Sequence, residues 1–142
     1  MSDTTFDVEA IAAAESEVLV LGDGASIYRR HERGDCAYII RRGQVEISER
    51  GRAVEIMQPG EIFGEMALID NEPRTTSAVA LGEAEVIPID RALFAVLIRD
   101  DPDFARTIIN LLARRLRAAM NLLEHQGDRP ARREAADTRA TA

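Results

Sequence analysis

The sequence contains no lysine, since all 18 of its basic residues are arginine, and these face 25 acidic residues. The absence of lysine excludes a P-loop that binds nucleoside triphosphates and any Schiff-base chemistry. The formal net charge of -7 provides no overall attraction to nucleic acid or to anionic lipid. Binding of an anion must therefore rest on a local cluster of arginines and backbone N–H groups.

Cysteine and histidine are also scarce, with one cysteine, Cys36, and two histidines, His31 and His125. A single cysteine cannot form a disulfide within the chain, and these three residues lack the spacing of a zinc site. No apolar run approaches the roughly 20 residues that span a membrane, and residues 1–14 lack the basic-then-apolar pattern of a secretory signal. We therefore expect a cytoplasmic protein with no metal and no membrane insertion.

The length of 142 residues and the hydrophobic content of 46% predict one folded domain with its own core. Residues 1–16 are rich in small and acidic residues, and we expect a mobile or lightly docked N-terminal arm. The domain occupies residues 17–126. Residues 127–142 mix Gly, Pro, Ala, Arg and Asp without an apolar period, which predicts a disordered tail.

Between residues 17 and 90, short apolar and β-branched runs alternate with glycine-containing turns, which favours an all-β sandwich or barrel. In residues 44–48, polar and apolar residues alternate as in a half-buried strand, and Arg50-Gly51 predicts a tight hairpin with residues 52–57. The expected strands are Val18–Leu21, Ser26–Arg30, Ala37–Arg41, Gln44–Glu49, Arg52–Met57, Ser77–Ala80 and Glu83–Asp90.

After Asp90 the apolar period changes from two to about 3.6, which predicts helices. Residues 91–99 form a short amphipathic helix with Asp90 as its N-cap, and Pro102 begins a longer helix that ends near Gln126. The longer helix carries a heptad-like apolar row, which consists of Ala105, Ile109, Leu112, Leu116, Ala119 and Leu123. This row either packs on the β structure or pairs with the same helix of a second copy.

Residues 63–80 contain the chemistry of a small anion site. A helical turn over Glu65–Ile69 directs backbone N–H groups to its N-terminal end, and Arg74 supplies a planar, two-donor guanidinium. Thr75 adds a hydroxyl. Glu65 would repel a bare anion, but its carboxylate suits a ligand that carries a hydroxyl next to its phosphate. A cyclic nucleotide has both groups.

The same residues resemble the phosphate-binding cassette of the cyclic-nucleotide-binding domain family. Phe63-Gly64-Glu65, the aliphatic run after it and Pro73-Arg74-Thr75-Thr76-Ser77-Ala78 match the pattern of that cassette. The segment from Arg33 to Val45 is similar to the Gly-Asp turn and the next strand of the family, and Asp101–Phe104 and Ala113–Leu116 look like the hinge and long helix of the catabolite-activator branch. The resemblance covers residues 18–125. It implies an eight-stranded β-roll (a jelly roll, or double-stranded β-helix), mainly β with flanking helices, followed by a short helix and a long C-terminal helix.

The resemblance also implies a role for each site residue. Arg74 pairs with the cyclic phosphate and Glu65 accepts the ribose hydroxyl, while Thr75 contacts the phosphate and, in some members, the guanine amino group. Arg115 pairs with the glutamate. The positions that supply polar base contacts in the catabolite-activator branch hold Ala119 and Met120 here, which form no strong hydrogen bond, so we expect Met120 to pack on the purine instead. The expected ligand-binding residues are Gly64, Glu65, Met66, Ala67, Leu68, Pro73, Arg74, Thr75, Thr76, Arg115 and Met120.

We expect from these residues a regulatory module that binds cAMP or cGMP, is not an enzyme and needs no cofactor. Its output would pass through a protein effector or through a homodimer formed by the long helix. No helix-turn-helix follows that helix, so direct DNA binding is not expected. One alternative is an interaction protein that keeps the fold without nucleotide. Another is a cupin-type metal enzyme, which needs two or three histidines in the β region, where the sequence has only His31.

Overall fold

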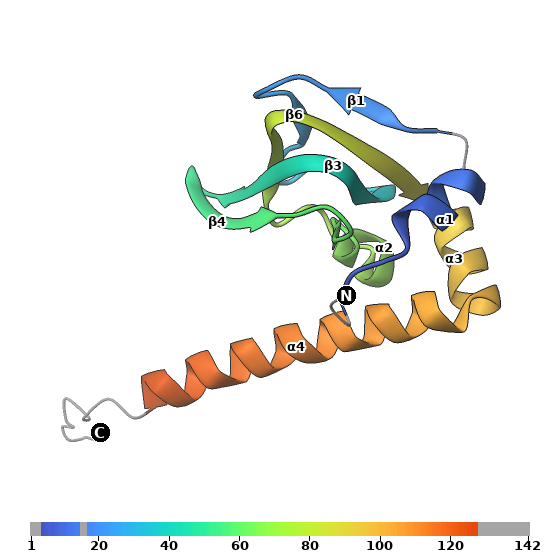
Figure 1. The fold of residues 1–142 in the computed structure, drawn as a ribbon. Coiled ribbons are helices and arrows are strands. Elements are labelled where there is room, and N and C mark those ends of the chain that lie inside the picture. The colour runs from blue at the N-terminus through green and yellow to red at the C-terminus, as the bar shows by residue number, and fades with distance from the viewer. Residues whose placement is uncertain (1–3, 15–16, 128–142) are drawn as a thin grey trace, which may run out of the picture. The chain divides into compact units, whose positions relative to one another are not determined.

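The structure is a computed structural model that describes residues 4–14 and 17–127, and these residues are mainly β structure with flanking helices (Figure 1). This result confirms the expected fold class. The elements follow one another as α1 (Val8–Ala14), β1 (Leu19–Leu21), β2 (Ser26–Tyr28), β3 (Cys36–Glu49), β4 (Arg52–Met57), β5 (Ile62–Phe63), α2 (Met66–Asp70), β6 (Ser77–Asp90), α3 (Arg91–Asp100) and α4 (Pro102–Gly127).

All strand pairs are antiparallel, and the neighbour order of the sheet is β1-β6-β3-β4. In addition, β2 pairs with β6 and β5 pairs with β3. The two long central strands run side by side from Cys36 opposite Asp90 to Ser48 opposite Ser77. Because every other strand pairs with β3 or β6, these two strands hold the sheet together.

The division into strands differs from the expectation of eight, since the described residues form six. We expected turns at Gly43 and Gly82, but β3 and β6 each continue through these positions for a total of 14 residues. Both glycines have positive φ (84° and 74°), and the register of the pair shifts on both sides of Arg42. The glycines therefore bend continuous strands at a β-bulge and do not end them.

The hairpin between β3 and β4 confirms the prediction for residues 44–57. Glu49 pairs with Arg52, and Val45 pairs with Met57. The two residues of the turn, Arg50 and Gly51, have φ of 53° and 80°, both positive as a type I′ turn requires.

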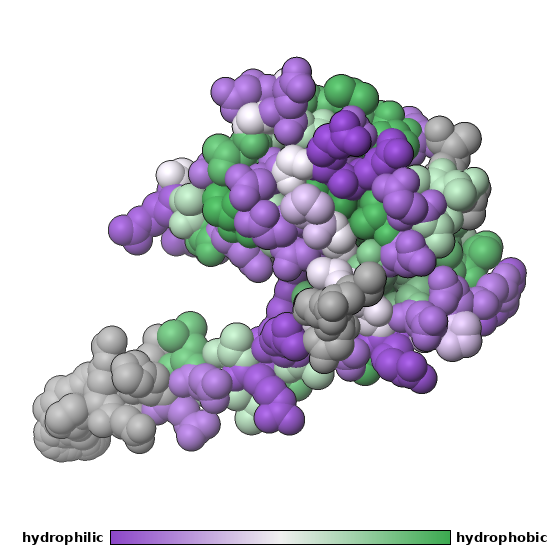
Figure 2. Space-filling view, viewed as in Figure 1, coloured by the Kyte–Doolittle hydropathy of each residue, from purple (hydrophilic) through white to green (hydrophobic). Residues whose placement is uncertain are grey.

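The core lies between the strands and is built around aromatic rings. Tyr28, Tyr38 and Phe63 have ring centroids 5.5 to 6.2 Å from one another. Apolar residues of three strands, β3, β4 and β6, complete this buried cluster, namely Ile40, Val45, Ile47, Met57, Ala78 and Val86. On the visible face of the β structure, hydrophilic residues lie between the hydrophobic ones (Figure 2).

Residues 4–14 of the N-terminal segment pack on the rest of the first compact unit, which ends at Thr107. Phe6 and Ile11 are buried, and the backbone N–H of Phe6 donates to the carbonyl of Gly60 over 2.8 Å. The ring of Phe6 also contacts the ring of Phe104, at a centroid distance of 5.1 Å. Residues 1–3 and 15–16 lie outside the described residues.

Each of the two C-terminal helices begins after an aspartate cap, of which Asp90 was predicted and Asp101 was not. The Asp90 carboxylate accepts a hydrogen bond from the N–H of Leu93, and the Asp101 carboxylate accepts one from the N–H of Phe104. The chain forms two compact units that divide after Thr107, so that the first turns of α4 belong to the first unit and the rest of α4 to the second. The predicted disordered tail lies outside the described residues, apart from Gly127.

Candidate functional site

The candidate site is the segment between β5 and β6, which is called the cassette below and comprises residues 62–77. After Phe63 the chain turns at Gly64, which has φ of 77°, and then forms the short helix α2. A Cβ at position 64 would lie 2.7 Å from Nη1 of Arg74 and 3.1 Å from the ring of Tyr28. Glycine is therefore required here both by the backbone conformation and by the close approach of Arg74.

Arg74 is the central side chain of the cassette and is only 6% exposed. Its Nη1 donates to the carbonyl of Gly64 over 2.7 Å, and its Nη2 donates to the carbonyl of Cys36 over 2.6 Å. The guanidinium carbon lies 3.9 Å from the centroid of the Tyr28 ring. The buried Nε has no hydrogen-bond partner. Because a guanidinium carries five N–H donors, Arg74 keeps donors for an acceptor with two oxygens, such as a phosphate.

The loop before β3 holds the backbone of Arg74 in place. The N–H of His31 donates to the carbonyl of Arg74, and the N–H of Arg74 donates to the carbonyl of Glu32, both over 2.8 Å. At Gly34 an added Cβ would lie 2.6 Å from Cζ of Arg74 and equally close to Cβ of Ala67. The guanidinium thus packs directly on the backbone of this loop, and the position of Arg74 is set by main-chain atoms.

Glu65 is completely buried, with an exposed fraction of 0%. Its backbone carbonyl accepts hydrogen bonds from the N–H groups of Leu68 and Ile69, which fixes it at the start of α2. Glu65 and Arg74 are the charged residues that are buried in the described part of the chain. Burial of charge is unfavourable unless partners compensate it. The cassette therefore concentrates one carboxylate and one guanidinium in an otherwise apolar interior.

The other predicted site residues are spread over several environments. Ala67 and Leu68 are buried, whereas the side chains of Met66, Pro73 and Thr75 are exposed and Thr76 is half-buried. Two further residues, Arg115 and Met120, belong to the second unit. Their roles at the ligand stay predictions.

Two residues at the site were not predicted from the sequence. Tyr28 lies under the guanidinium of Arg74, and Cys36 contributes its backbone carbonyl. A third, Gly34, had a signal in the Arg33-Gly34-Asp35 turn, although its contact with Arg74 was not foreseen. Nothing in the sequence around Tyr28 or Cys36 distinguishes either residue from an ordinary strand residue.

The thiol of Cys36 and the phenol of Tyr38 lie beside Arg74 and share one trend. Burial raises the pKa of the Cys36 thiol, Asp35 and Asp90 raise it further, and Arg74 opposes them. Burial also raises the pKa of Tyr38. Both groups are therefore neutral at pH 7, and neither adds negative charge next to Arg74. The described residues contain no group of three or more His, Cys, Asp or Glu side chains that could hold a metal ion.

Comparisons with known proteins agree with this geometry. The family model "Cyclic nucleotide-binding domain" matches residues 18–101. The chain is 37% identical over 105 residues to a CRP-like cAMP-activated global transcriptional regulator of Mycobacterium tuberculosis, a match that covers 70% of this chain and 47% of the relative. It is 36% identical over 101 residues to the cyclic AMP receptor protein of Thermus thermophilus, which covers 68% of this chain and 47% of the relative.

Among solved structures, the catabolite activator protein of Thermus thermophilus superposes with a TM-score of 0.74 and 32% identity, over 84% of this chain and 59% of that chain. A β-roll whose cassette buries a glutamate and an arginine is typical of a ligand-binding domain. The family match identifies the class of ligand-binding domain. The chain belongs to the cyclic nucleotide-binding domain family. It spans about half the length of the curated relatives that it matches. Within the described residues, no helix is long and apolar enough to cross a membrane.

Proposed function

We propose that this domain binds a cyclic nucleotide in the cassette, with Arg74 on the cyclic phosphate and Glu65 on the ribose 2′-hydroxyl. The observation that carries this proposal is the buried guanidinium of Arg74, whose Nε has no partner. A buried, incompletely bonded donor is costly, and an anion that accepts from it removes that cost. The buried carboxylate of Glu65 makes a ligand with a hydroxyl near its phosphate the best fit.

Other residues complete the proposed site as the family pattern implies. The backbone of Gly64, Ala67 and Leu68 lines the phosphate and ribose. Arg115 and Met120, which belong to the second unit, keep the roles expected for them from the sequence. The remaining cassette side chains flank the ligand, namely Met66, Pro73, Thr75 and Thr76.

Both cAMP and cGMP fit this proposal. The names of two relatives point to cAMP, whereas the threonine at position 75 favours cGMP competence. We propose a regulatory module without catalytic activity or cofactor, whose output passes through a protein effector or a homodimer. The heptad-spaced residues Ile109, Leu116 and Leu123 are 64%, 61% and 67% exposed, which supports pairing of α4 with a second copy.

Calorimetric titration of the full chain with cAMP, cGMP and 5′-AMP tests the proposal. We expect saturable binding of at least one cyclic nucleotide. We expect the affinity for 5′-AMP to be about tenfold lower or less, because its acyclic phosphate is not held next to the 2′-hydroxyl. If neither cyclic nucleotide binds while the protein is folded, the proposal is wrong. The alternative, an interaction protein that retains the fold without nucleotide, then stands.

The ring of Tyr28 should affect affinity through Arg74. Replacement of Tyr28 by leucine removes the aromatic face. A desolvated cation–π contact contributes about 2 kcal/mol, so we expect weakening of cyclic-nucleotide binding by up to roughly 30-fold. Tyr28→Phe keeps the ring and should bind more tightly than Tyr28→Leu. Calorimetry gives the affinities, and urea unfolding gives the stabilities. Equal weakening in both variants would show that the ring is not the cause.

A further inference from the structure

A polar cavity opens at the surface at one edge of the cassette, and Arg74 is not among the residues that line it. It has a volume of about 200 Å³ and is formed where three segments meet, namely the loop before β3, the C-terminal end of α2 and the start of α3. Its lining residues are Arg33, Gly34, Asp35, Asn71, Glu72, Pro73 and Arg91. Four of the seven carry a formal charge, and all four are exposed at the surface.

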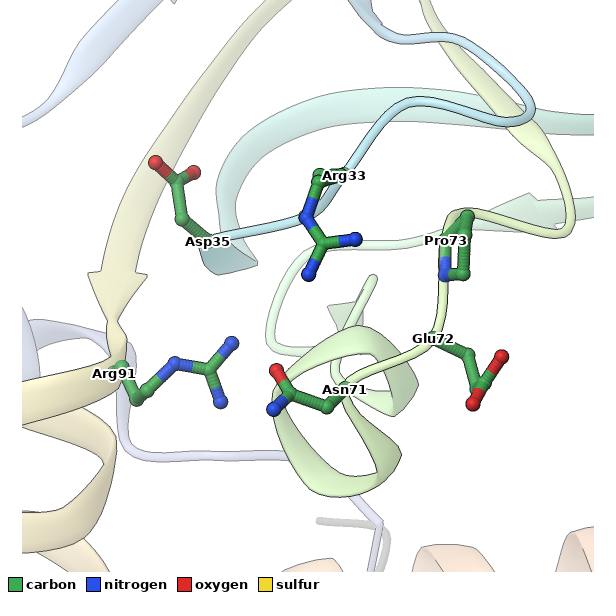
Figure 3. Close-up of a pocket in the computed structure, with 7 residues that line it drawn as sticks. Arg33, Asp35, Asn71, Glu72, Pro73 and Arg91 are labelled. Carbon is green, nitrogen blue, oxygen red and sulfur yellow. The ribbon is translucent and has the colours of Figure 1, made fainter.

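The positively and negatively charged side chains of this cavity point in different directions (Figure 3). The guanidinium groups of Arg33 and Arg91 point into the space between the segments, and the side-chain amide of Asn71 points toward Arg91. The carboxylates of Asp35 and Glu72 point away from that space. Neither arginine forms a recorded ion pair with a carboxylate of the described residues. The interior of the cavity is therefore cationic, although its lining residues sum to zero charge.

Local structure holds two of these donors in place. Nη1 of Arg91 donates to the carbonyl of Leu68 over 3.1 Å, which attaches the guanidinium to the end of α2 and leaves its other N–H groups available. Asn71 is the C-cap of α2 and adopts a left-handed conformation, with φ of 64°. A residue in this conformation leaves the direction of the helix, which brings its side chain to the cavity.

We propose that this cavity, which is called the Arg33/Arg91 cavity below, is a second anion site that binds a phosphate group. Two planar guanidinium forks from different segments require an acceptor with several oxygens, and a tetrahedral phosphate offers these in more than one plane. The volume accommodates inorganic phosphate or the phosphate of a monoester. The site does not depend on cyclic-nucleotide binding, because its donors are distinct from Arg74, which bonds the carbonyls of Gly64 and Cys36.

Nuclear magnetic resonance on the 15N-labelled full chain tests this site directly. Inorganic phosphate and O-phosphoserine are titrated at constant ionic strength against sodium chloride, and the Nε–H signals of Arg33, Arg91 and Arg74 are followed with the side-chain amide of Asn71. We expect saturable shifts at Arg33, Arg91 and Asn71. The tighter of the two ligands identifies whether free phosphate or a monoester is the better occupant.

The variants Arg33→Gln and Arg33→Gln/Arg91→Gln remove one and both guanidinium groups. Each should weaken phosphate binding by about tenfold or more per group, as expected for loss of a charge-assisted hydrogen bond. Arg50→Gln/Arg52→Gln makes the same charge change on the β3–β4 hairpin and should bind phosphate normally. The single variant Arg33→Gln guards against misfolding, because it leaves the bond from Arg91 to Leu68 in place.

Three outcomes would overturn the proposal of the second anion site. One is shifts that match those in sodium chloride, and another is equal weakening in the hairpin control. The third is saturable shifts at Arg74 alone, which would place the phosphate in the cassette. That last result would support the proposed cyclic-nucleotide site while rejecting the Arg33/Arg91 cavity, so the two proposals fail separately.

Discussion

Replacement of Arg74 by alanine should weaken cyclic-nucleotide binding by about 30-fold to several thousandfold. The range corresponds to roughly 2–5 kcal/mol, the cost of truncating one member of a buried, hydrogen-bonded charge pair. The reason is structural, because Arg74 is a buried cation whose guanidinium still has donors to offer. Calorimetric titration with cAMP and cGMP measures the loss.

Two further variants separate the role of charge from the role of shape. Arg74→Lys keeps the positive charge but loses the planar fork and the second donor nitrogen, so we expect affinity between that of alanine and arginine. Arg52→Ala removes an exposed arginine from β4 and should bind as the unmodified protein does. Circular dichroism and thermal unfolding confirm that each variant is folded. Equal affinity of Arg74→Ala and the unmodified protein would refute the assigned role of Arg74.

The largest effect on stability should come from Gly43→Ala. An added Cβ at this position would run into the carbonyl oxygen of Glu83 and lie 2.9 Å from Cα of Ala84, and both atoms belong to the backbone of β6. The positive φ of 84° adds roughly 1–2 kcal/mol for any residue with a Cβ. Crowding of a packed interior adds about 1–3 kcal/mol, so the total cost should be about 2–5 kcal/mol.

Gly51→Ala is the matched control for this experiment. Gly51 has a similar φ of 80°, but no atom lies within 4 Å of a Cβ built there. The control should therefore cost only the conformational part, and the difference between the two variants measures the crowding at Gly43. Urea unfolding followed by circular dichroism gives both free energies. If the two variants are equally stable, β6 does not approach Gly43 as closely as the structure shows.

Local signals in the sequence predicted the elements that local interactions determine. The β3–β4 hairpin follows from the alternation in residues 44–48 and from a glycine that tolerates positive φ. The helix α3 begins at Arg91, directly after the predicted cap Asp90, and Pro102 begins α4. The cassette helix α2 lies one residue later than expected, at Met66–Asp70. The fold class was predicted as well, because short apolar runs separated by regularly spaced glycine-containing turns are typical of few folds other than a β sandwich or barrel.

Long-range contacts account for what the sequence did not show. Glycine marks both a turn and a bulge, and only the presence of a neighbouring strand decides between them, as at Gly43 and Gly82. Likewise, the partners of Arg74 are a ring 46 positions earlier in the chain and two backbone carbonyls, none of which carries a pattern along the sequence. The cassette motif predicted that Arg74 binds an anion, but not what supports the guanidinium.

The two carbonyls that hold Arg74 give the arginine a further role in the sheet. Strands β3 and β5 pair through Tyr38 opposite Phe63, and Arg74 bridges the carbonyl of Gly64, the residue after Phe63, and the carbonyl of Cys36, two residues before Tyr38. Its guanidinium therefore joins the two strands through side-chain hydrogen bonds, just past the point where their backbone pairing ends. The side chain proposed to bind the phosphate thus also links β3 to the end of β5. Because these hydrogen bonds use main-chain oxygens, the side chain at position 36 can vary without loss of this link or of the binding site.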